Sequence, residues 1–160
     1  MSIDRVREYF RNFSLEDRVL EFTVSSATVE LAAQAVGVIP ARIAKSLTFM
    51  LPDGPIIIVA AGDARIDNSR FKAVYHTKAK MLTAGEVTEL IGHNVGGVCP
   101  FAIHDGVRVY LDESMKRFDS VYPACGSSNS AIELTCEELE KTAQNFQSWV
   151  DVCKGWREEA

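Results

Sequence analysis

Lys45 is the residue whose type and position most directly suggest chemistry. It follows residues 41–44 and stands where the apolar strand predicted over residues 46–51 begins. A lysine in this position presents a compact positive charge to a phosphate or a carboxylate. An ordinary surface lysine at the end of a strand explains the same position, so the residue type alone leaves both interpretations open.

The segment from Gly96 to Phe101 is the second place where chemistry could occur. Gly96 and Gly97 give the backbone unusual freedom and let a ligand approach it closely, and Pro100 stiffens the exit from the segment. Free backbone N–H groups in such a loop can donate to a carbonyl or an oxyanion. A tight turn between a helix and a strand accounts for these residues equally well.

Cys99 lies inside the same segment and could act as a nucleophile, with His93 or His104 as its base. Nothing in the spacing of these residues requires that role. The four cysteines include no C-x-x-C pair, and the three histidines do not complete a zinc pattern. We therefore expect no metal ion and no cofactor, and cysteines that are reduced and mainly structural.

A small polar loop precedes the predicted strand over residues 131–134. Gly126 is followed there by Ser127, Ser128 and Asn129, which supply hydroxyl, amide and backbone groups. Such a loop can form the floor of a pocket for a small polar ligand or water. A solvated loop is the alternative explanation.

The periodicity and turn signals predict the elements that must position these segments. Helices are expected over residues 3–13, 28–36, 68–75, 83–91 and 115–122, and a final helix follows the capping box at residues 135–138 and continues to residue 150. Strands are expected over residues 19–24, 46–51, 55–61, 98–103, 107–111 and 131–134. Strands outnumber crossover helices and several connections resemble hairpins. The fold class is therefore α/β of the α+β type, with a mixed, mainly antiparallel β-sheet surrounded by helices.

The composition is that of one globular domain over residues 1–160, with 47% hydrophobic residues. No apolar run approaches the roughly 20 residues of a membrane span, and the N-terminus does not resemble a secretory signal. We expect a cytoplasmic protein without a membrane partner. The net charge of −5 weighs against coating DNA through a broad basic face, but it allows contact with one end of an RNA. Basic residues concentrate between Arg42 and Lys80, where a solvated face is the simplest explanation.

Three segments, taken in order, resemble one family. They are Gly37-Val38 with Arg42 to Leu47, Val95 to Phe101, and Gly126-Ser127-Ser128 leading to Ile132-Glu133-Leu134. Their order and placement are similar to those of the YbaK/EbsC family, also called the bacterial prolyl-tRNA synthetase editing-domain superfamily, over about residues 20–142. The resemblance implies a mixed sheet surrounded by helices and, because no synthetase regions are present, a free-standing aminoacyl-tRNA deacylase.

The resemblance also implies roles for individual residues. Lys45 matches the family's hallmark lysine, which holds the acceptor end of the tRNA, and Gly96 and Gly97 match the glycine pair whose backbone contacts the aminoacyl group. The remaining matches are Pro100, which shapes that loop, Gly126 of the last motif, and the loop residues Ser127, Ser128 and Asn129. The chain departs from the family where Ser127-Ser128 replaces basic residues, where Cys99 replaces serine or threonine, and at Ala124, where some members carry a serine.

The implied activity is trans-editing, in which the ester of a mischarged tRNA is hydrolysed. The expected substrate is tRNA-Pro carrying a small amino acid such as Cys or Ala, and the expected partners are the aminoacyl-tRNA acceptor end and either prolyl-tRNA synthetase or an elongation factor. Two alternatives remain. One is a catalytically inactive module of the same fold that binds tRNA or a small ligand, and the other is a Cys99-dependent hydrolase.

Overall fold

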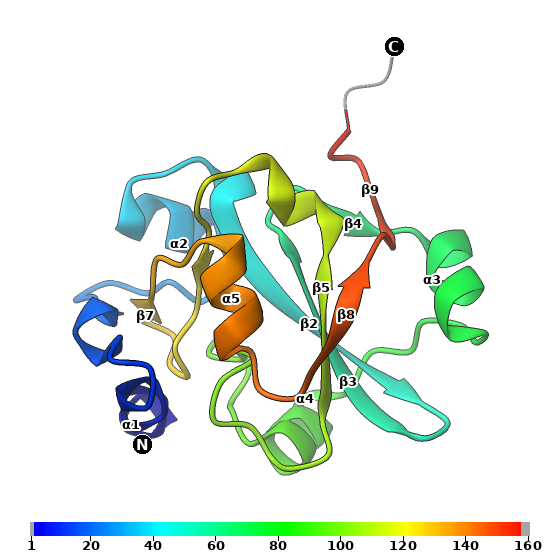
Figure 1. The fold of residues 1–160 in the computed structure, drawn as a ribbon, viewed down its shortest axis with the longest axis horizontal. Helices are drawn as coiled ribbons and strands as arrows, with labels where there is room; N and C mark the ends of the chain where they lie inside the picture. The colour runs from blue at the N-terminus through cyan, green and yellow to red at the C-terminus, as the bar shows by residue number, and fades with distance from the viewer. Residues whose placement is uncertain (1, 158–160) are drawn as a thin grey trace.

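A five-stranded mixed sheet forms the centre of the computed structural model, which describes residues 2–157. Its strands lie in the order β6-β2-β3-β5-β8, and the four longer strands β2, β3, β5 and β8 cross the centre of Figure 1. Their bounds are Tyr122–Pro123 for β6, Ile43–Leu51 for β2, Gly54–Ala61 for β3, Arg108–Asp112 for β5 and Phe146–Val150 for β8.

The hairpin of β2 and β3 is the longest pairing in the sheet. It is antiparallel and runs from Ala44 opposite Ala61 to Leu51 opposite Gly54. Gly54 has φ +128°, a backbone conformation that favours glycine at the turn. β6 pairs with β2, β5 pairs with β3 and β8 pairs with β5, each in parallel. Two small antiparallel sheets complete the strands, one from β1 (Leu20–Glu21) and β7 (Ser130–Ala131), the other from β4 (Arg65–Ile66) and β9 (Cys153–Lys154).

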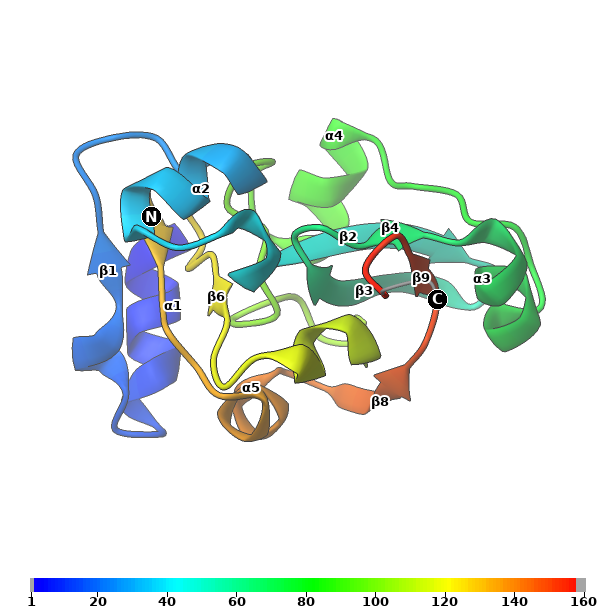
Figure 2. The ribbon, with the colours of Figure 1, turned by 90° about the horizontal axis from the view of Figure 1, so that it is seen from above.

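Helices cover both faces of the sheet, as the sequence predicts, and the expected mixed α/β fold is confirmed. Figure 2 shows α2 and α4 on one side of the β2–β3 hairpin and α5 on the other. The α-helices are α1 (Ser2–Arg11), α2 (Val29–Val36), α3 (Asn68–Tyr75), α4 (Ala84–Glu86, continued by a π-helical turn over Val87–Ile91) and α5 (Cys136–Thr142). Short 3-10 helices span Glu16–Arg18, Pro40–Arg42 and Glu113–Arg117. Among residues 2–157, no helix combines the length and apolar character that crossing a membrane requires.

The helix ends are set by local sequence signals. The Thr28 side chain accepts a hydrogen bond from the Leu31 N–H at 3.2 Å, and Gly37 ends α2 with φ +86°. Capping boxes begin both α4 and α5, because Thr83 and Thr135 each exchange hydrogen bonds with a glutamate three residues later. These starts agree with the predicted ones.

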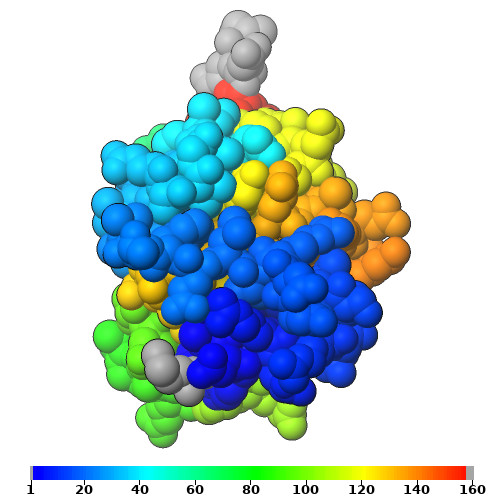
Figure 3. All heavy atoms as spheres, turned by 90° about the vertical axis from the view of Figure 1, so that its left-hand side faces the viewer, coloured from blue at the N-terminus to red at the C-terminus, as the bar shows by residue number. Residues whose placement is uncertain are grey.

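The hydrophobic core lies around β3, in which the side chains of Ile56, Ile57, Ile58 and Val59 are fully buried. Burial of consecutive residues on both faces requires cover on both sides of the strand. The N-terminal residues cover one end of the molecule, as the blue surface in Figure 3 shows. There the rings of Phe10 and Phe101 lie 4.6 Å apart between their centroids.

The predicted strand over residues 98–103 is wrong. This segment is irregular, and Ala102 has φ +53°. The side chain of Gln144 occupies the backbone groups that a strand would use: its oxygen accepts from the Ile103 N–H and its amide donates to the Ile103 carbonyl, both at 2.9 Å. The Gln144 side chain, from a distant part of the sequence, therefore makes the hydrogen bonds that a neighbouring strand would otherwise make.

The predicted final helix continues too far. α5 ends at Thr142, and residues 146–150 form β8 at the edge of the central sheet. Asn145 between them has φ +54°, a conformation that asparagine tolerates better than most residues. Smaller differences occur at two more places: the strand expected over 19–24 covers only β1, and the helix expected over 115–122 is the 3-10 helix Glu113–Arg117.

Candidate functional site

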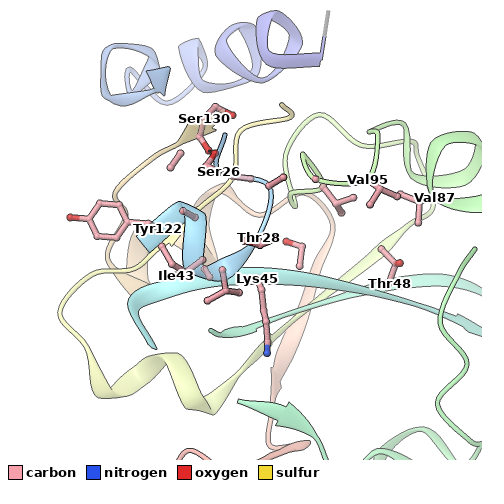
Figure 4. Close-up of a pocket in the computed structure, with 18 of the residues that line it drawn as sticks. Ser26, Thr28, Ile43, Lys45, Thr48, Val87, Val95, Tyr122 and Ser130 are labelled. Atoms are coloured by element: carbon pink, nitrogen blue, oxygen red, sulfur yellow. Dashed lines mark hydrogen bonds between the residues drawn. The ribbon is translucent and has the colours of Figure 1, made fainter. Parts of the chain in front are cut away.

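A cavity of about 280 Å³ lies between α2, the first half of β2, the start of α4 and the loop before Val98 (Figure 4). Side chains from distant parts of the sequence line it. Hydroxyl groups come from Ser26, Thr28, Ser46, Thr48 and Ser130, and apolar surface comes from Ala32, Ile43, Val87, Val95, Val98, Tyr122 and Ala131. A small pocket with few polar groups among apolar ones is typical of a binding site for a small chemical group.

The hydroxyl groups of the lining differ in what they already bind. Thr28 caps α2, and the Ser130 hydroxyl accepts from the Cys125 N–H at 3.2 Å and from Ser127 at 2.8 Å. The Ser46 hydroxyl is buried and has no hydrogen-bond partner within residues 2–157. A buried polar group without a partner is costly, so a ligand group that reached the Ser46 hydroxyl would remove this cost.

Lys45 is part of the cavity wall, but its position differs from the expected one. β2 begins at Ile43, so Lys45 lies inside the strand opposite Ala60 instead of at its entrance. Its ammonium donates to the carbonyls of Gly62, at 3.4 Å, and Ala64. Figure 4 shows the amino group pointing away from Thr28 and Val95.

The carboxylates of Asp63 and Glu30 attract the Lys45 ammonium without forming an ion pair with it. Its hydrogen-bond partners are neutral carbonyls, and it forms no ion pair with a carboxylate of the described residues. Burial lowers the pKa of Lys45, because desolvation penalises the charged form. A bound anion close to the ammonium would relieve this penalty.

Of the two glycines, Gly96 lines the cavity and Gly97 does not. Gly96 has φ +97°, and a methyl group there would lie 3.4 Å from the Ala27 side chain. Gly97 is buried, and a methyl group on it would lie 2.6 Å from backbone atoms of Gly126 and Ser127. The two glycine motifs therefore pack directly against each other, backbone to backbone.

Pro100 and the loop from Gly126 to Asn129 stand behind the cavity wall. None of these residues is among those lining the cavity, and Pro100 is buried, its carbonyl accepting from the Gln144 N–H at 2.8 Å. Gly126 packs against α1, where a methyl group would lie 2.9 Å from the Ser2 carbonyl oxygen.

The serines of that loop hold other backbone segments in place. The Ser128 carbonyl accepts from the Ser26 N–H at 2.6 Å, and the Asn129 amide donates to the Phe22 carbonyl at 2.9 Å. Ser127 donates to Ser130, which is itself a lining residue. The loop thus positions the segment that leads into α2 and forms one wall of the cavity.

Several lining residues were missed from the sequence, among them Ser26, Ala32, Ser46, Thr48 and Tyr122. Ser46 and Thr48 are two positions apart in the predicted strand, so their side chains share one face of it. This alternation was the signal available for them. Ala32 and Tyr122 carried no such signal, because their place depends on how α2 and β6 pack on β2.

Cys99 and His93 come together, with the Cys99 sulfur 3.5 Å from His93 Nε2. Both are buried, and Cys99 has no exposed surface. Burial raises the pKa of Cys99 to about 12, and burial also lowers the pKa of His93. A thiol that is inaccessible and protonated is a poor nucleophile, so this geometry argues against the Cys99-dependent hydrolase. Elsewhere in residues 2–157, no group of three or more His, Cys, Asp or Glu residues is placed to hold a metal ion.

Residues 23–142 match the family model of the aminoacyl-tRNA editing domain. The chain belongs to this family, which confirms the resemblance to the YbaK/EbsC editing domains. The Bacillus subtilis (strain 168) protein named "Uncharacterized protein YwhH" is 52% identical, and the match covers 98% of this chain and 99% of that protein. The proline--tRNA ligase of Halalkalibacterium halodurans is 30% identical over 72% of this chain, which matches only 20% of that ligase.

Solved structures agree with the family assignment. A protein described as a candidate trans-editing enzyme for prolyl tRNA synthetase superposes with a TM-score of 0.86 at 29% sequence identity, covering 96% of this chain and 98% of that one. The hypothetical protein APE2540 superposes with a TM-score of 0.83 at 28% identity, covering 94% of this chain and 99% of its own.

Proposed function

We propose that this protein is a trans-editing aminoacyl-tRNA deacylase, which hydrolyses the ester bond of mischarged tRNA in the cytoplasm. The observation that carries the proposal is the cavity of about 280 Å³, walled by small and hydroxyl-bearing side chains, in a chain of the editing-domain family. Its volume lies just below the range of roughly 300–1,000 Å³ that is usual for pockets of drug-sized ligands. It therefore suits a small aminoacyl group better than a nucleotide.

The chemistry makes modest demands on the protein. The ester that links an amino acid to tRNA is already activated, so an enzyme needs to orient it, stabilise the developing oxyanion and admit a nucleophile. Water is the proposed nucleophile, activated by the vicinal hydroxyl of the terminal adenosine. For a cysteinyl substrate, the substrate's own thiol could attack instead. This route requires no Ser-His-Asp triad.

The proposed roles follow the geometry of the cavity. Lys45 anchors a phosphate of the acceptor end, since its ammonium binds neutral carbonyls and forms no ion pair with a carboxylate of the described residues. The backbone of Gly96, which lines the cavity, orients the carbonyl of the ester. Gly97, Pro100 and the Gly126–Asn129 loop act as positioning residues, because they hold the cavity wall without lining it.

The proposed substrate is tRNA-Pro carrying Ala or Cys, and prolyl-tRNA synthetase or an elongation factor is the proposed source of the charged tRNA. The similarity to segments of proline--tRNA ligases and to a candidate prolyl trans-editing enzyme supports the choice of tRNA. The size of the cavity supports the choice of amino acid, because a small pocket excludes large side chains more firmly than it selects among small ones.

The test is deacylation of tRNA-Pro charged separately with Ala, Cys, Ser or Pro. We expect the wild-type protein to release at least one of the three mischarged amino acids and to spare Pro, and we expect Lys45→Ala to lose this activity. Lys141→Ala, which removes an exposed lysine of α5 instead, is the matched control and should behave as wild type. Mischarged tRNA that binds to the wild-type protein yet survives would favour the inactive binding module.

A further inference from the structure

Three exposed lysines lie on α3 and on the connection that leads from it to the cavity. Most arginines and lysines of this acidic protein form an ion pair with a carboxylate, but Lys72, Lys78 and Lys80 form none within residues 2–157. Residues 65–80 hold five lysines and arginines and only one carboxylate. We refer to Lys72, Lys78 and Lys80 as the lysine track.

The lysine track leads to the cavity. Lys72 belongs to α3, and Lys78 and Lys80 lie on the connection that runs from α3 to α4 along the edge of β2 (Figure 2). The next residue, Met81, lines the cavity. The Lys80 carbonyl accepts from the Met50 N–H at 2.8 Å, which holds this part of the connection against the strand.

A hollow of about 380 Å³ lies along the lysine track, and Lys72 and Lys78 line it together with Asn68, Ser69 and Ala79. Two carboxylates flank this region in the sequence, and both are already engaged. Asp67 caps α3 by accepting from two backbone N–H groups, and Glu86 accepts from the Thr83 N–H at 2.9 Å in the capping box of α4. The hollow therefore offers uncompensated positive charge with hydroxyl and amide donors beside it.

We propose that the lysine track binds the sugar–phosphate backbone of the tRNA acceptor arm and directs its 3′ end into the cavity. This inference rests on the proposed deacylase function. Lys78 and Lys80 are exposed and the residue between them, Ala79, is half-buried, so the two lysine side chains lie on the same side of the connection. Neighbouring exposed charges of one sign suit the repeated phosphates of a nucleic acid strand, and such contacts carry no base-specific recognition.

A charge-neutralising triple variant, Lys72→Gln, Lys78→Gln and Lys80→Gln, tests the proposal. The control is a second triple variant, Arg11→Gln, Lys116→Gln and Lys141→Gln. It changes the net charge equally, but its three residues lie elsewhere, on α1, on the 3-10 helix after β5 and on α5. Each protein is measured for binding of uncharged tRNA at two salt concentrations, for kcat/KM on full-length mischarged tRNA, and for hydrolysis of the same amino acid esterified to adenosine alone.

Wild-type binding should weaken with salt, and three phosphate contacts to the single-stranded 3′ end account for about a 20-fold loss of affinity over a fourfold rise in salt. The lysine-track variant should lack these three contacts, so its plot of log affinity against log salt concentration should be shallower by about 2. Its kcat/KM on full-length tRNA should fall at least about tenfold through KM, while its hydrolysis of the short ester stays unchanged. The control variant should match wild type in all three measurements.

The outcomes separate this inference from the function on which it rests. Failure of the wild-type protein to hydrolyse either ester would contradict the deacylase, whereas the binding measurement would still test the lysine track. Equal affinity for tRNA and equal salt slope in wild type and the lysine-track variant would contradict the proposal that the lysine track binds tRNA. An equal loss in the control variant would also overturn it, because net charge alone would then explain the effect.

Discussion

Replacing Gly97 with alanine tests how the two glycine motifs hold the cavity wall. The new methyl group would lie 2.6 Å from the Gly126 carbonyl carbon, 2.6 Å from the Ser127 nitrogen and 2.8 Å from the Gly126 oxygen. Carbon atoms in favourable contact lie about 3.5–4.0 Å apart, so the overlap is close to 1 Å. All three neighbours are backbone atoms, which cannot rotate away as a side chain would.

The magnitude follows from this overlap. Overpacking a well-packed interior costs about 1–3 kcal/mol, and a clash with immobile backbone belongs at the upper end of that range. A loss of about 3 kcal/mol in the free energy of unfolding lowers Tm by roughly 6–12 °C for a chain of this size. Deacylation should fall as well, because Gly96 in the cavity wall would move with its neighbour.

Gly85→Ala is the matched control. Gly85 lies in α4 with no neighbouring atom within 4 Å of the added methyl group. Alanine is favoured over glycine in a helix by about 0.8–1.0 kcal/mol, so this variant should be slightly more stable than wild type. Thermal unfolding followed by circular dichroism compares the three proteins, and deacylation is measured well below the lowest Tm. A Gly97→Ala protein with the Tm of wild type would refute the packing of Gly97 against Gly126.

Three further predictions concern the cavity and its neighbours. Burial lowers the pKa of Lys45, so enzymatic deacylation should decline as the pH rises, with a pKa below the ordinary lysine value of about 10.4. The rates are corrected for spontaneous ester hydrolysis. Lys45→Arg should retain partial activity without this decline. Cys99→Ala should keep wild-type activity, and a thiol-blocking reagent should affect the variant and the wild type equally. A large loss of activity in the variant would instead support the Cys99-dependent hydrolase. Ala32→Val narrows the cavity, so its kcat/KM should fall about 10-fold or more for the bulkier of two accepted amino acids and less for the smaller one; equal losses for both would contradict a size-selective pocket.

The elements that could be predicted from the sequence are those whose ends depend on local interactions. The capping boxes at Thr83 and Thr135 and the turn at Gly54 each involve residues within four positions of one another. The strand β8 could not be predicted in the same way. Phe146 and Val150 fit a helical spacing, and only pairing with β5 and the positive φ of Asn145 make this segment a strand.

The candidate site shows the same division between local and distant interactions. Lys45 and Gly96 were found because their types stand out in a short stretch of sequence, and both line the cavity. The residues Ser127 to Asn129 were expected in the pocket because they are small and polar. Their backbone and side-chain polar groups instead bind Ser26, Phe22 and Ser130. Sequence composition cannot distinguish a polar group that faces a ligand from one that holds a neighbouring segment in place.

The family resemblance places basic residues where this chain has Ser127-Ser128, so the loop carries no positive charge at these two positions. Ser128 is exposed, and its contact with the Ser26 N–H is made by its backbone carbonyl, so the interaction between the loop and α2 does not depend on a side chain at this position. Positive charge that the loop does not supply is present on the opposite side of the cavity, where Lys80 precedes the lining residue Met81. Binding of the tRNA backbone would thereby shift from the loop to the edge of β2, while the cavity itself keeps its small lining.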